Sequence, residues 1–227
     1  MYKFNNNLVE TMVSGNLFIR SLSSILICAV VSLSLYFGGI AFYILCFFLA
    51  MVSSVELFNI MQCRRLYYIP AFFMIVIPYA SLVYIYNLLH GEIILIWLIF
   101  VIWGTDVAAY FVGKNIGEKK IVPMISPNKT WAGLFGGIVA GAFISVVISV
   151  IFGIFFVFHA FIAGILIAFV AQVGDITESY VKRLCKVKDS GSFIPGHGGI
   201  LDRMDSFIFT APLVAYYVQK FSKFFLA

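Results

Sequence analysis

Long apolar runs, separated by short polar segments, follow one another along almost the whole chain. A helix that crosses a bilayer needs about 20 mostly apolar residues. Windows of this kind predict seven membrane-spanning helices, at residues 21–37, 40–60, 68–88, 93–113, 132–154, 157–180 and 204–220. Because the connectors are short, the pattern predicts an all-α, polytopic membrane helix bundle of neighbouring antiparallel spans.

The composition is that of a membrane protein. Hydrophobic residues make up 63% of the 227 residues and charged residues 11%, with a mean hydropathy of +1.05, whereas a soluble domain carries about 25% charged residues. This excludes a water-soluble fold and predicts a single membrane domain over residues 1–227. The four cysteines include no C-x-x-C pair and no histidine at ligand spacing, so we expect neither a disulfide framework nor a zinc site.

Basic residues are concentrated in alternate connectors. Seven spans place the N-terminus, the 61–67 turn, the 114–131 loop and the 181–203 loop on one side, and these segments hold 13 of the 15 Lys and Arg residues. By the positive-inside rule this side faces the cytoplasm, and we expect a place in the inner (cell) membrane of a bacterium. Lys220 and Lys223 then fall on the opposite side, which favours a last helix that is short, tilted or interfacial.

Acidic residues gather near the same face. Six of the ten carboxylates lie within or at the ends of predicted spans, close to the basic side: Glu56, Asp106, Asp175, Glu178, Asp202 and Asp205. Each could be a helix-end charge that reaches water, but charges in a span usually face the interior and meet a partner or an ion. Asp175 and Glu178 share a helix face, as do Asp202 and Asp205. Such hard oxygen ligands suit Mg²⁺, with a second cation left open, and Asp106 could add a third carboxylate.

The 114–131 loop reads KNIGEKKIVPMISPNKTW. Ser126 ends its extended part, and Lys129 and Thr130 supply an ammonium and a hydroxyl just before a glycine-rich helix. A helix N-terminus with small residues allows close approach of an anion. The alternative is a solvated basic loop with no further role.

The 181–203 loop reads VKRLCKVKDSGSFIPGHGGILDR. Its glycines expose backbone N–H groups and let the chain fold tightly around a ligand. His197 stands among these glycines and could contact phosphate or orient the site. The chain has no G-x-x-x-x-G-K-[ST] and no G-x-G-x-x-G sequence, so neither a P-loop nor a Rossmann site is indicated.

The stretch SYVKRLCKVKDSGSFIPGHGGILDRMD, from Ser179 to Asp205, resembles the signature of phosphatidate cytidylyltransferases, the CDP-diacylglycerol synthases. Segments 106–113 and 126–131 also look like motifs of that family. The resemblance covers the C-terminal half well, so we expect hydrophobic helices in 1–100 and a catalytic half in 101–227. In the first part the resemblance is only a hydrophobic array, with Glu56 near a helix end.

The resemblance implies a transfer of CMP from CTP to phosphatidate, which yields CDP-diacylglycerol and pyrophosphate with a divalent metal. It implies that Asp175 and Asp202 bind Mg²⁺, with Asp205, Glu178 and Asp106 as supporting ligands. Basic side chains would neutralise the phosphates. We expect Lys182 and Arg203 to act in catalysis, and six residues to bind substrate: Ser126, Lys129, Thr130, Arg183, Lys188 and His197.

Three other classes of protein compete with this interpretation. A purely structural membrane protein is one of them, and it leaves the glycine and charge pattern unexplained. A transporter also buries carboxylates, but it generally places them near the bilayer midplane between repeats. Another CTP-dependent membrane enzyme, acting on a polyprenol or an ether lipid, would use the same charges. We expect CTP, phosphatidate and membrane lipid as partners, no nucleic acid, and a homodimer as one possible assembly.

Overall fold

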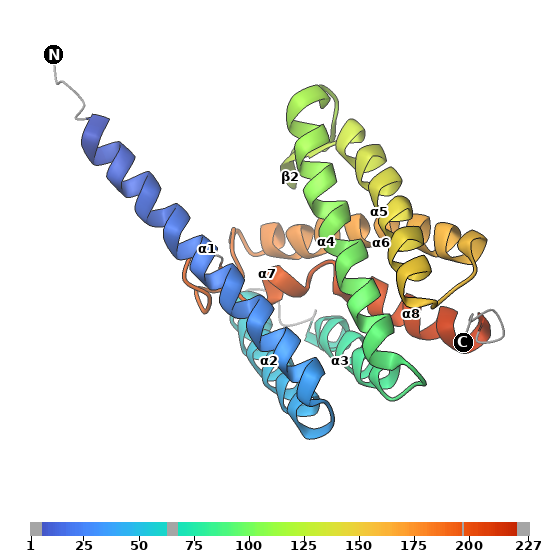
Figure 1. Ribbon diagram of the computed structural model, residues 1–227. Helices are drawn as coiled ribbons and strands as arrows, with labels where there is room; N and C mark the ends of the chain where they lie inside the picture. The colour runs from blue at the N-terminus through green and yellow to red at the C-terminus, as the bar shows by residue number, and fades with distance from the viewer. Residues whose placement is uncertain (1–5, 63–67, 197, 222–227) are drawn as a thin grey trace, which may run out of the picture.

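The computed structural model describes residues 6–62, 68–196 and 198–221. Helices dominate this part of the chain, with one two-stranded hairpin between α4 and α5 (Figure 1). In chain order the elements are α1 (Asn6–Phe37), α2 (Gly39–Met61), α3 (Tyr68–Tyr86), α4 (Gly91–Ile116), β1 (Lys120–Val122), β2 (Ser126–Thr130), α5 (Trp131–Phe152), α6 (Val157–Leu184), α7 (Leu201–Met204) and α8 (Phe207–Phe221). The predicted all-α fold is confirmed.

Six helices in the described residues are long and apolar enough to cross a membrane, which supports an integral membrane protein. Their apolar segments are Ile19–Phe37, Gly39–Met61, Ile69–Tyr86, Gly91–Ile116, Trp131–Phe152 and Val157–Leu184. The seventh predicted span corresponds to α8, which has 15 residues. At 1.5 Å per residue it is about 22 Å long, shorter than a bilayer core of about 30 Å. The apolar window at 204–220 had included Asp205 and Ser206, where the chain bends between α7 and α8.

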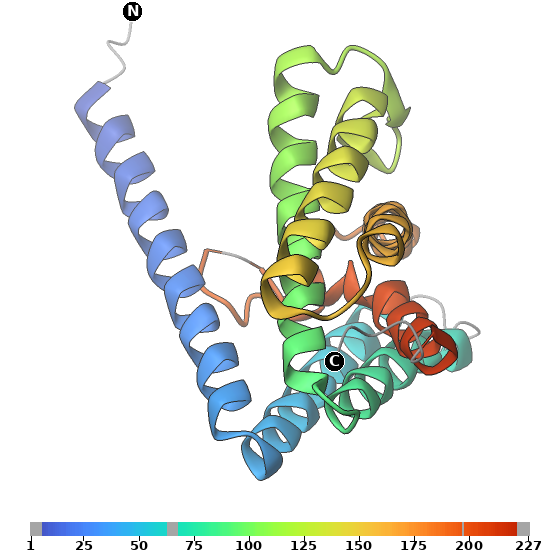
Figure 2. The same cartoon turned by 45° about the vertical axis from the view of Figure 1, so that its right-hand side comes forward.

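Helices α4 and α5 form a close antiparallel pair (Figures 1 and 2). The contact depends on small residues in α5. A Cβ added to Gly133 would lie 2.7 Å from the carbonyl oxygen of Ala109, and one added to Gly136 would lie 2.7 Å from the Val112 side chain. Glycine therefore lets the two helices approach closely, as is common between membrane helices.

Helix α6 runs across the α4–α5 pair instead of alongside it (Figures 1 and 2). This differs from the simple row of antiparallel neighbours that the short connectors predict. Small residues again explain the contact: a Cβ on Gly141 would lie 2.7 Å from Cβ of Ala168, and one on Gly164 would lie 2.6 Å from Cβ of Ser145. The crossing brings the C-terminal turns of α6 towards the centre of the molecule, next to α7.

The predicted loop at 114–131 contains a hairpin. β1 pairs with β2 in antiparallel register, with Lys120 opposite Thr130 and Val122 opposite Ser126. Thr130 ends β2 and is also the N-cap of α5, where its Oγ1 accepts a hydrogen bond of 3.1 Å from the backbone N–H of Gly133. Side-chain caps of this kind start a helix at a defined residue. The cap thus fixes the position of Lys129, one residue earlier.

The buried hydrophobic core is built mainly from α2, α3, α4, α6 and α8, and Trp97 of α4 is fully buried in it. The Trp97 Nε1–H donates to the carbonyl oxygen and the Oγ of Ser145 at 3.2 Å each, and its ring packs edge-on against Phe155.

Cysteine pairing differs from the expectation: Cys28 and Cys46 are free, whereas Cys185 is disulfide-bonded. Spacing along the chain could not reveal this bond.

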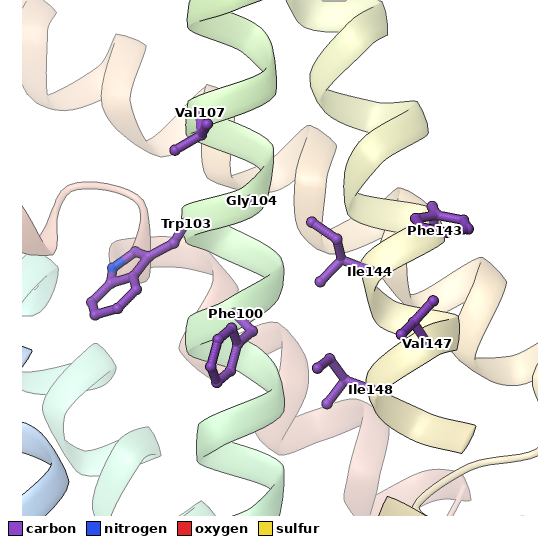
Figure 3. Close-up of a pocket in the computed structure, with 8 residues that line it drawn as sticks. All are labelled: Phe100, Trp103, Gly104, Val107, Phe143, Ile144, Val147 and Ile148. Carbon is purple, nitrogen blue, oxygen red and sulfur yellow. The ribbon is translucent and has the colours of Figure 1, made fainter. Parts of the chain in front are cut away.

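An open apolar cleft of about 370 Å³ lies between α4 and α5 (Figure 3). Phe100, Trp103 and Val107 from α4 line it, together with Phe143 and Val147 from α5. Such a lining suits hydrocarbon and offers nothing to a phosphate. The charged residues gather elsewhere, at the C-terminal turns of α6.

Candidate active site

One face of α6 carries the centre of the charged cluster. Asp175, Glu178 and Lys182 follow one another at i, i+3 and i+7, so they lie along the same side of the helix. Lys182 and Arg183 stand in the last turn, where positive charge complements the helix dipole. The predicted shared face of Asp175 and Glu178 is therefore present, and it is directed at α7 and at the hairpin.

Lys182 joins α6 to α7. Its Nζ lies 2.7 Å from Oε2 of Glu178 and 2.7 Å from Oδ1 of Asp202. All three side chains are buried, with exposed fractions of 11% for Lys182, 2% for Glu178 and 8% for Asp202. One ammonium thus sits between two buried carboxylates.

Backbone N–H groups also hold Asp202. The N–H of Ser190 donates to Oδ1 and Oδ2 at 3.1 and 3.0 Å, and the N–H of Gly199 donates to Oδ2 at 2.9 Å. Burial alone would raise the pKa of Asp202, but the hydrogen bonds from Lys182, Gly199 and Ser190 outweigh it and lower this pKa below its ordinary value. The carboxylate is therefore fixed in its ionised form.

The hairpin supplies a second ion pair. Nζ of Lys129, on β2, lies 2.6 Å from Oδ2 of Asp175 and donates to Oε1 of Gln172 at 3.0 Å. Asp175 is 31% exposed, and Ser179 Oγ donates to its Oδ1 at a long 3.4 Å. The hairpin thus brings Lys129 to the same face of α6 that carries Lys182 in its last turn.

Asp205 and Asp106 complete the acidic group. Asp205 follows α7, and burial raises its pKa well above the ordinary value, with further contributions from the negative charges of Asp175, Glu178 and Asp106. Asp106, on α4, is exposed and lies within electrostatic reach of Asp175, Lys129 and Arg203. The five predicted acidic residues therefore act on one another, as their position near one face suggested.

The predicted substrate-binding residues differ in their contacts and in their exposure. The Thr130 hydroxyl is buried and caps α5. Its structural role is observed, and its contact with substrate stays a prediction.

Arg183 donates from Nε to the carbonyl of Ile125 at 3.2 Å and from Nη1 to that of Val187 at 2.7 Å, which ties the hairpin to the end of α6. Lys188 and Arg203 are exposed, and Ser126 is half-buried at the start of β2. His197 lies outside the described residues.

Glu56 belongs to the site although the predicted set of site residues omits it. From α2, its Oε1 accepts from the N–H of Ile200 at 3.0 Å, and its Oε2 accepts from the N–H of Leu201 at 2.9 Å and from the Ser190 hydroxyl at 3.1 Å. A lone carboxylate in an otherwise apolar span was the available signal. Its partners lie in a loop 134 to 145 residues later, which no spacing along the chain reveals.

The donors present are of the kind that Mg²⁺ takes, because all are hard oxygens. Oε1 of Glu178 is buried and has no hydrogen-bond partner among the described residues. In the same part of the chain, however, no three or more His, Cys, Asp or Glu side chains are grouped closely enough to hold a metal ion. The ammonium of Lys182 lies between Glu178 and Asp202 instead, and that of Lys129 lies against Asp175. The chemistry of the donors fits a cation.

The chain matches the cytidylyltransferase family over residues 64–221. It belongs to the cytidylyltransferase family. Among curated members, the phosphatidate cytidylyltransferase of Rickettsia bellii is 32% identical over 220 residues, which cover 93% of this chain and 95% of that protein. The phosphatidate cytidylyltransferase of Bacillus subtilis is 43% identical over 135 residues, 59% of this chain and 50% of that protein. That of Brucella suis is 40% identical over 124 residues, 55% of this chain and 46% of that protein.

The family match contains the charged cluster, from Asp106 to Asp205, together with the hairpin. A cytidylyltransferase joins a phosphate oxygen to the α-phosphorus of CTP, so its site must hold several negative charges at once. The lysines of the cluster are suited to this task. Glu56, which holds the loop, precedes the matched segment.

Proposed function

We propose that this chain transfers CMP from CTP to phosphatidate and releases pyrophosphate. The observation that carries the proposal is the similarity to the Rickettsia bellii phosphatidate cytidylyltransferase along nearly the full length of both chains. The site supports it independently, because carboxylates and lysines from three separate segments meet at helix ends. CTP is soluble in water and phosphatidate stays in the bilayer, so only a site at the membrane surface reaches both.

The reaction forms a bond between a phosphatidate oxygen and the α-phosphorus of CTP, and it breaks the bond from that phosphorus to the oxygen of the leaving pyrophosphate. Phosphatidate is a phosphomonoester with a second pKa of about 6, so its oxygen is already largely ionised and no strong general base is required. The pyrophosphate leaves with the bonding electron pair. The protein therefore has to bring two anions together and neutralise their charge.

Lys129 and Lys182 are the groups best placed to do so. Each ammonium is held at 2.6–2.7 Å from a carboxylate, and each can turn to a phosphate oxygen when its carboxylate takes another partner. Asp175 and Asp202 would hold Mg²⁺, which supplies positive charge to the phosphates when bound. Arg203 and Lys188, both exposed, are accessible to the soluble nucleotide.

We place the site at the cytoplasmic face of the inner membrane. The basic connectors favour this orientation, and CTP is a cytoplasmic nucleotide. Lys129, Lys182 and Arg183 all lie on the side that the positive-inside rule assigns to the cytoplasm. Protease or thiol-reagent access in right-side-out and inverted vesicles tests this orientation directly.

Purified protein in detergent, given CTP labelled at the α-phosphate, tests the reaction. We expect label in lipid only when phosphatidate and a divalent cation are both present, with one pyrophosphate released for each labelled lipid. A polyprenol and an ether-lipid acceptor are the comparison substrates. Label in either of these but not in phosphatidate would replace the proposed substrate, and no label in any lipid would favour the transporter class.

A further inference from the structure

Glu56 joins α2 to the signature loop, which we define as the described residues 186–196 and 198–200 together with Leu201, the first residue of α7. Its side chain is only 6% exposed. From the described residues it accepts three hydrogen bonds of 2.9 to 3.1 Å, and the donors are neutral groups of this loop: the N–H of Ile200, the N–H of Leu201 and the hydroxyl of Ser190. A buried carboxylate is costly unless such donors satisfy it, so loop and carboxylate stabilise each other.

Glu56 and Asp202 divide the donors of the signature loop between them. The N–H of Gly199 goes to Asp202, and the N–H groups of the next two residues go to Glu56. Ser190 joins the two carboxylates, because its N–H donates to Asp202 while its hydroxyl donates to Glu56. The position of Asp202 is therefore coupled to that of Glu56 through one residue and one short stretch of backbone.

Two glycines of the loop leave room for the carboxylate of Glu56. A Cβ on Gly191 would lie 2.7 Å from Oε1 of Glu56, and a Cβ on Gly199 would lie 2.5 Å from Oε2. Real Cβ atoms do not approach oxygen so closely, so any other residue at either position would displace the carboxylate or the loop. The glycine pattern of the signature thus depends in part on a residue outside it.

The donor arrangement calls for a carboxylate. Donors point at both oxygens of Glu56, and only an ionised carboxylate accepts at both. The amide of glutamine accepts at one atom and would direct an NH₂ group at an N–H or hydroxyl donor. Glutamine fills the same volume as glutamate, so it would keep the packing of this position while it breaks the hydrogen bonding.

We propose that Glu56 is a positioning residue for CMP transfer, which acts by holding the signature loop so that Asp202 and Lys182 meet at the reaction site. The inference rests on the proposed function, because its test measures the rate of CMP transfer. Neither the family match, which begins at residue 64, nor the signature itself includes Glu56. If Glu56 has this role, an N-terminal helix contributes to the geometry of the catalytic site.

Glu56→Gln and Glu56→Asp test this role, with Ser53→Ala as the matched control. Ser53 lies one turn earlier on α2, and its buried Oγ is 2.8 Å from Oη of Tyr79, so the control removes a buried hydrogen bond without touching the loop. We expect Glu56→Gln to lower kcat about 10- to 100-fold per folded molecule, with KM for CTP and phosphatidate changed less than about threefold. Ser53→Ala should stay within about threefold of wild type in kcat.

The order of the two Glu56 variants separates positioning from packing. Glu56→Asp keeps both acceptors but leaves a gap, whereas Glu56→Gln fills the space but loses an acceptor. We expect Asp to retain more activity than Gln. A packing role gives the reverse order, and that result, or full activity of Glu56→Gln, overturns the inference.

Ser190→Ala decides the matter if both Glu56 variants fail to fold. It removes one hydrogen bond to Glu56 and keeps the other two, so we expect kcat to fall about 3- to 10-fold. Wild-type kcat in this variant would overturn the role. An inactive wild-type protein would instead overturn the proposed function, which separates the two failures.

Discussion

Asp175 and Asp202 are both predicted metal ligands, yet the structure holds them in different ways. Asp202 is 8% exposed and accepts from Lys182 and from two backbone N–H groups. Asp175 is 31% exposed, and its close contact is a single ammonium, that of Lys129, at 2.6 Å. Backbone donors of the loop hold Asp202, whereas Asp175 depends on the long, flexible side chain of Lys129.

The difference indicates how the two could share the work. Asp175 can exchange its partner by a movement of the Lys129 side chain, whereas Asp202 cannot leave its hydrogen bonds without a rearrangement of the loop. We therefore interpret Asp202 as the fixed point of the site and Asp175 as the adjustable one. Paired substitutions at the two positions test this contrast.

Removing either charge has the largest expected effect. Asp202→Asn and Asp175→Asn should each lower kcat about 1,000-fold, because each removes a carboxylate aimed at the proposed cation. They should differ in stability: Asp202→Asn should cost about 1–3 kcal/mol through its charged hydrogen bonds, and Asp175→Asn less than about 1 kcal/mol. Initial rates and SDS-induced unfolding measure the two quantities. Normal turnover in Asp202→Asn would rule out its metal role.

Substitutions of Lys182 and Lys129 should differ more in their effect on protein stability than in their effect on activity. Lys182→Met leaves Glu178 and Asp202 as buried carboxylates without their shared ammonium, so unfolding should become easier by about 3–5 kcal/mol. Lys129→Met leaves Asp175 able to reach water, so the loss should be about 1 kcal/mol. Unfolding of both variants in the same detergent checks this. Equal losses would show that Asp175 is held as firmly as Asp202.

A matched pair of glycines gives the smallest and most specific effect. Gly196 and Gly198 have φ of 76° and 85°, so alanine at either should cost about 1–2 kcal/mol in backbone strain. A Cβ on Gly198 would lie 2.7 Å from Oδ2 of Asp202, whereas one on Gly196 would meet only the flexible Arg20 side chain and its surroundings, at 3.0 Å or more. Gly198→Ala should therefore lower kcat about 10-fold and Gly196→Ala should not. Equal rates at equal stability would contradict a fixed Asp202.

The helices were predictable because apolar length is a strong signal. The expected span at 157–180 corresponds to Val157–Leu184, and that at 40–60 to Gly39–Met61. The expected span at 204–220 corresponds in the described residues to α8, Phe207–Phe221, which begins three residues later because the chain turns at Asp205 and Ser206. The crossing of α6 over α5 was also beyond prediction, because it depends on which small residues face each other.

The site was predictable where residues share a helix face or lie in the signature. Helical periodicity places Asp175 and Glu178 on one face, and the loop leads directly to Asp202. Lys182 was expected in the 181–203 loop and lies instead in the last turn of α6. The pairing of Lys129 with Asp175 required the hairpin, which was expected only as a loop. Thr130 illustrates the limit of residue type as a guide: its hydroxyl serves the start of α5.

The hydrogen bond from Ile200 to Glu56 also sets an order of assembly in time. The two residues are 144 positions apart, so the ribosome makes the carboxylate long before its donors. Until the loop emerges, α2 carries a carboxylate in an apolar setting without its native partners. The catalytic centre can therefore close only after nearly all the spans have been synthesised, which makes CMP transfer one of the last properties the growing chain acquires.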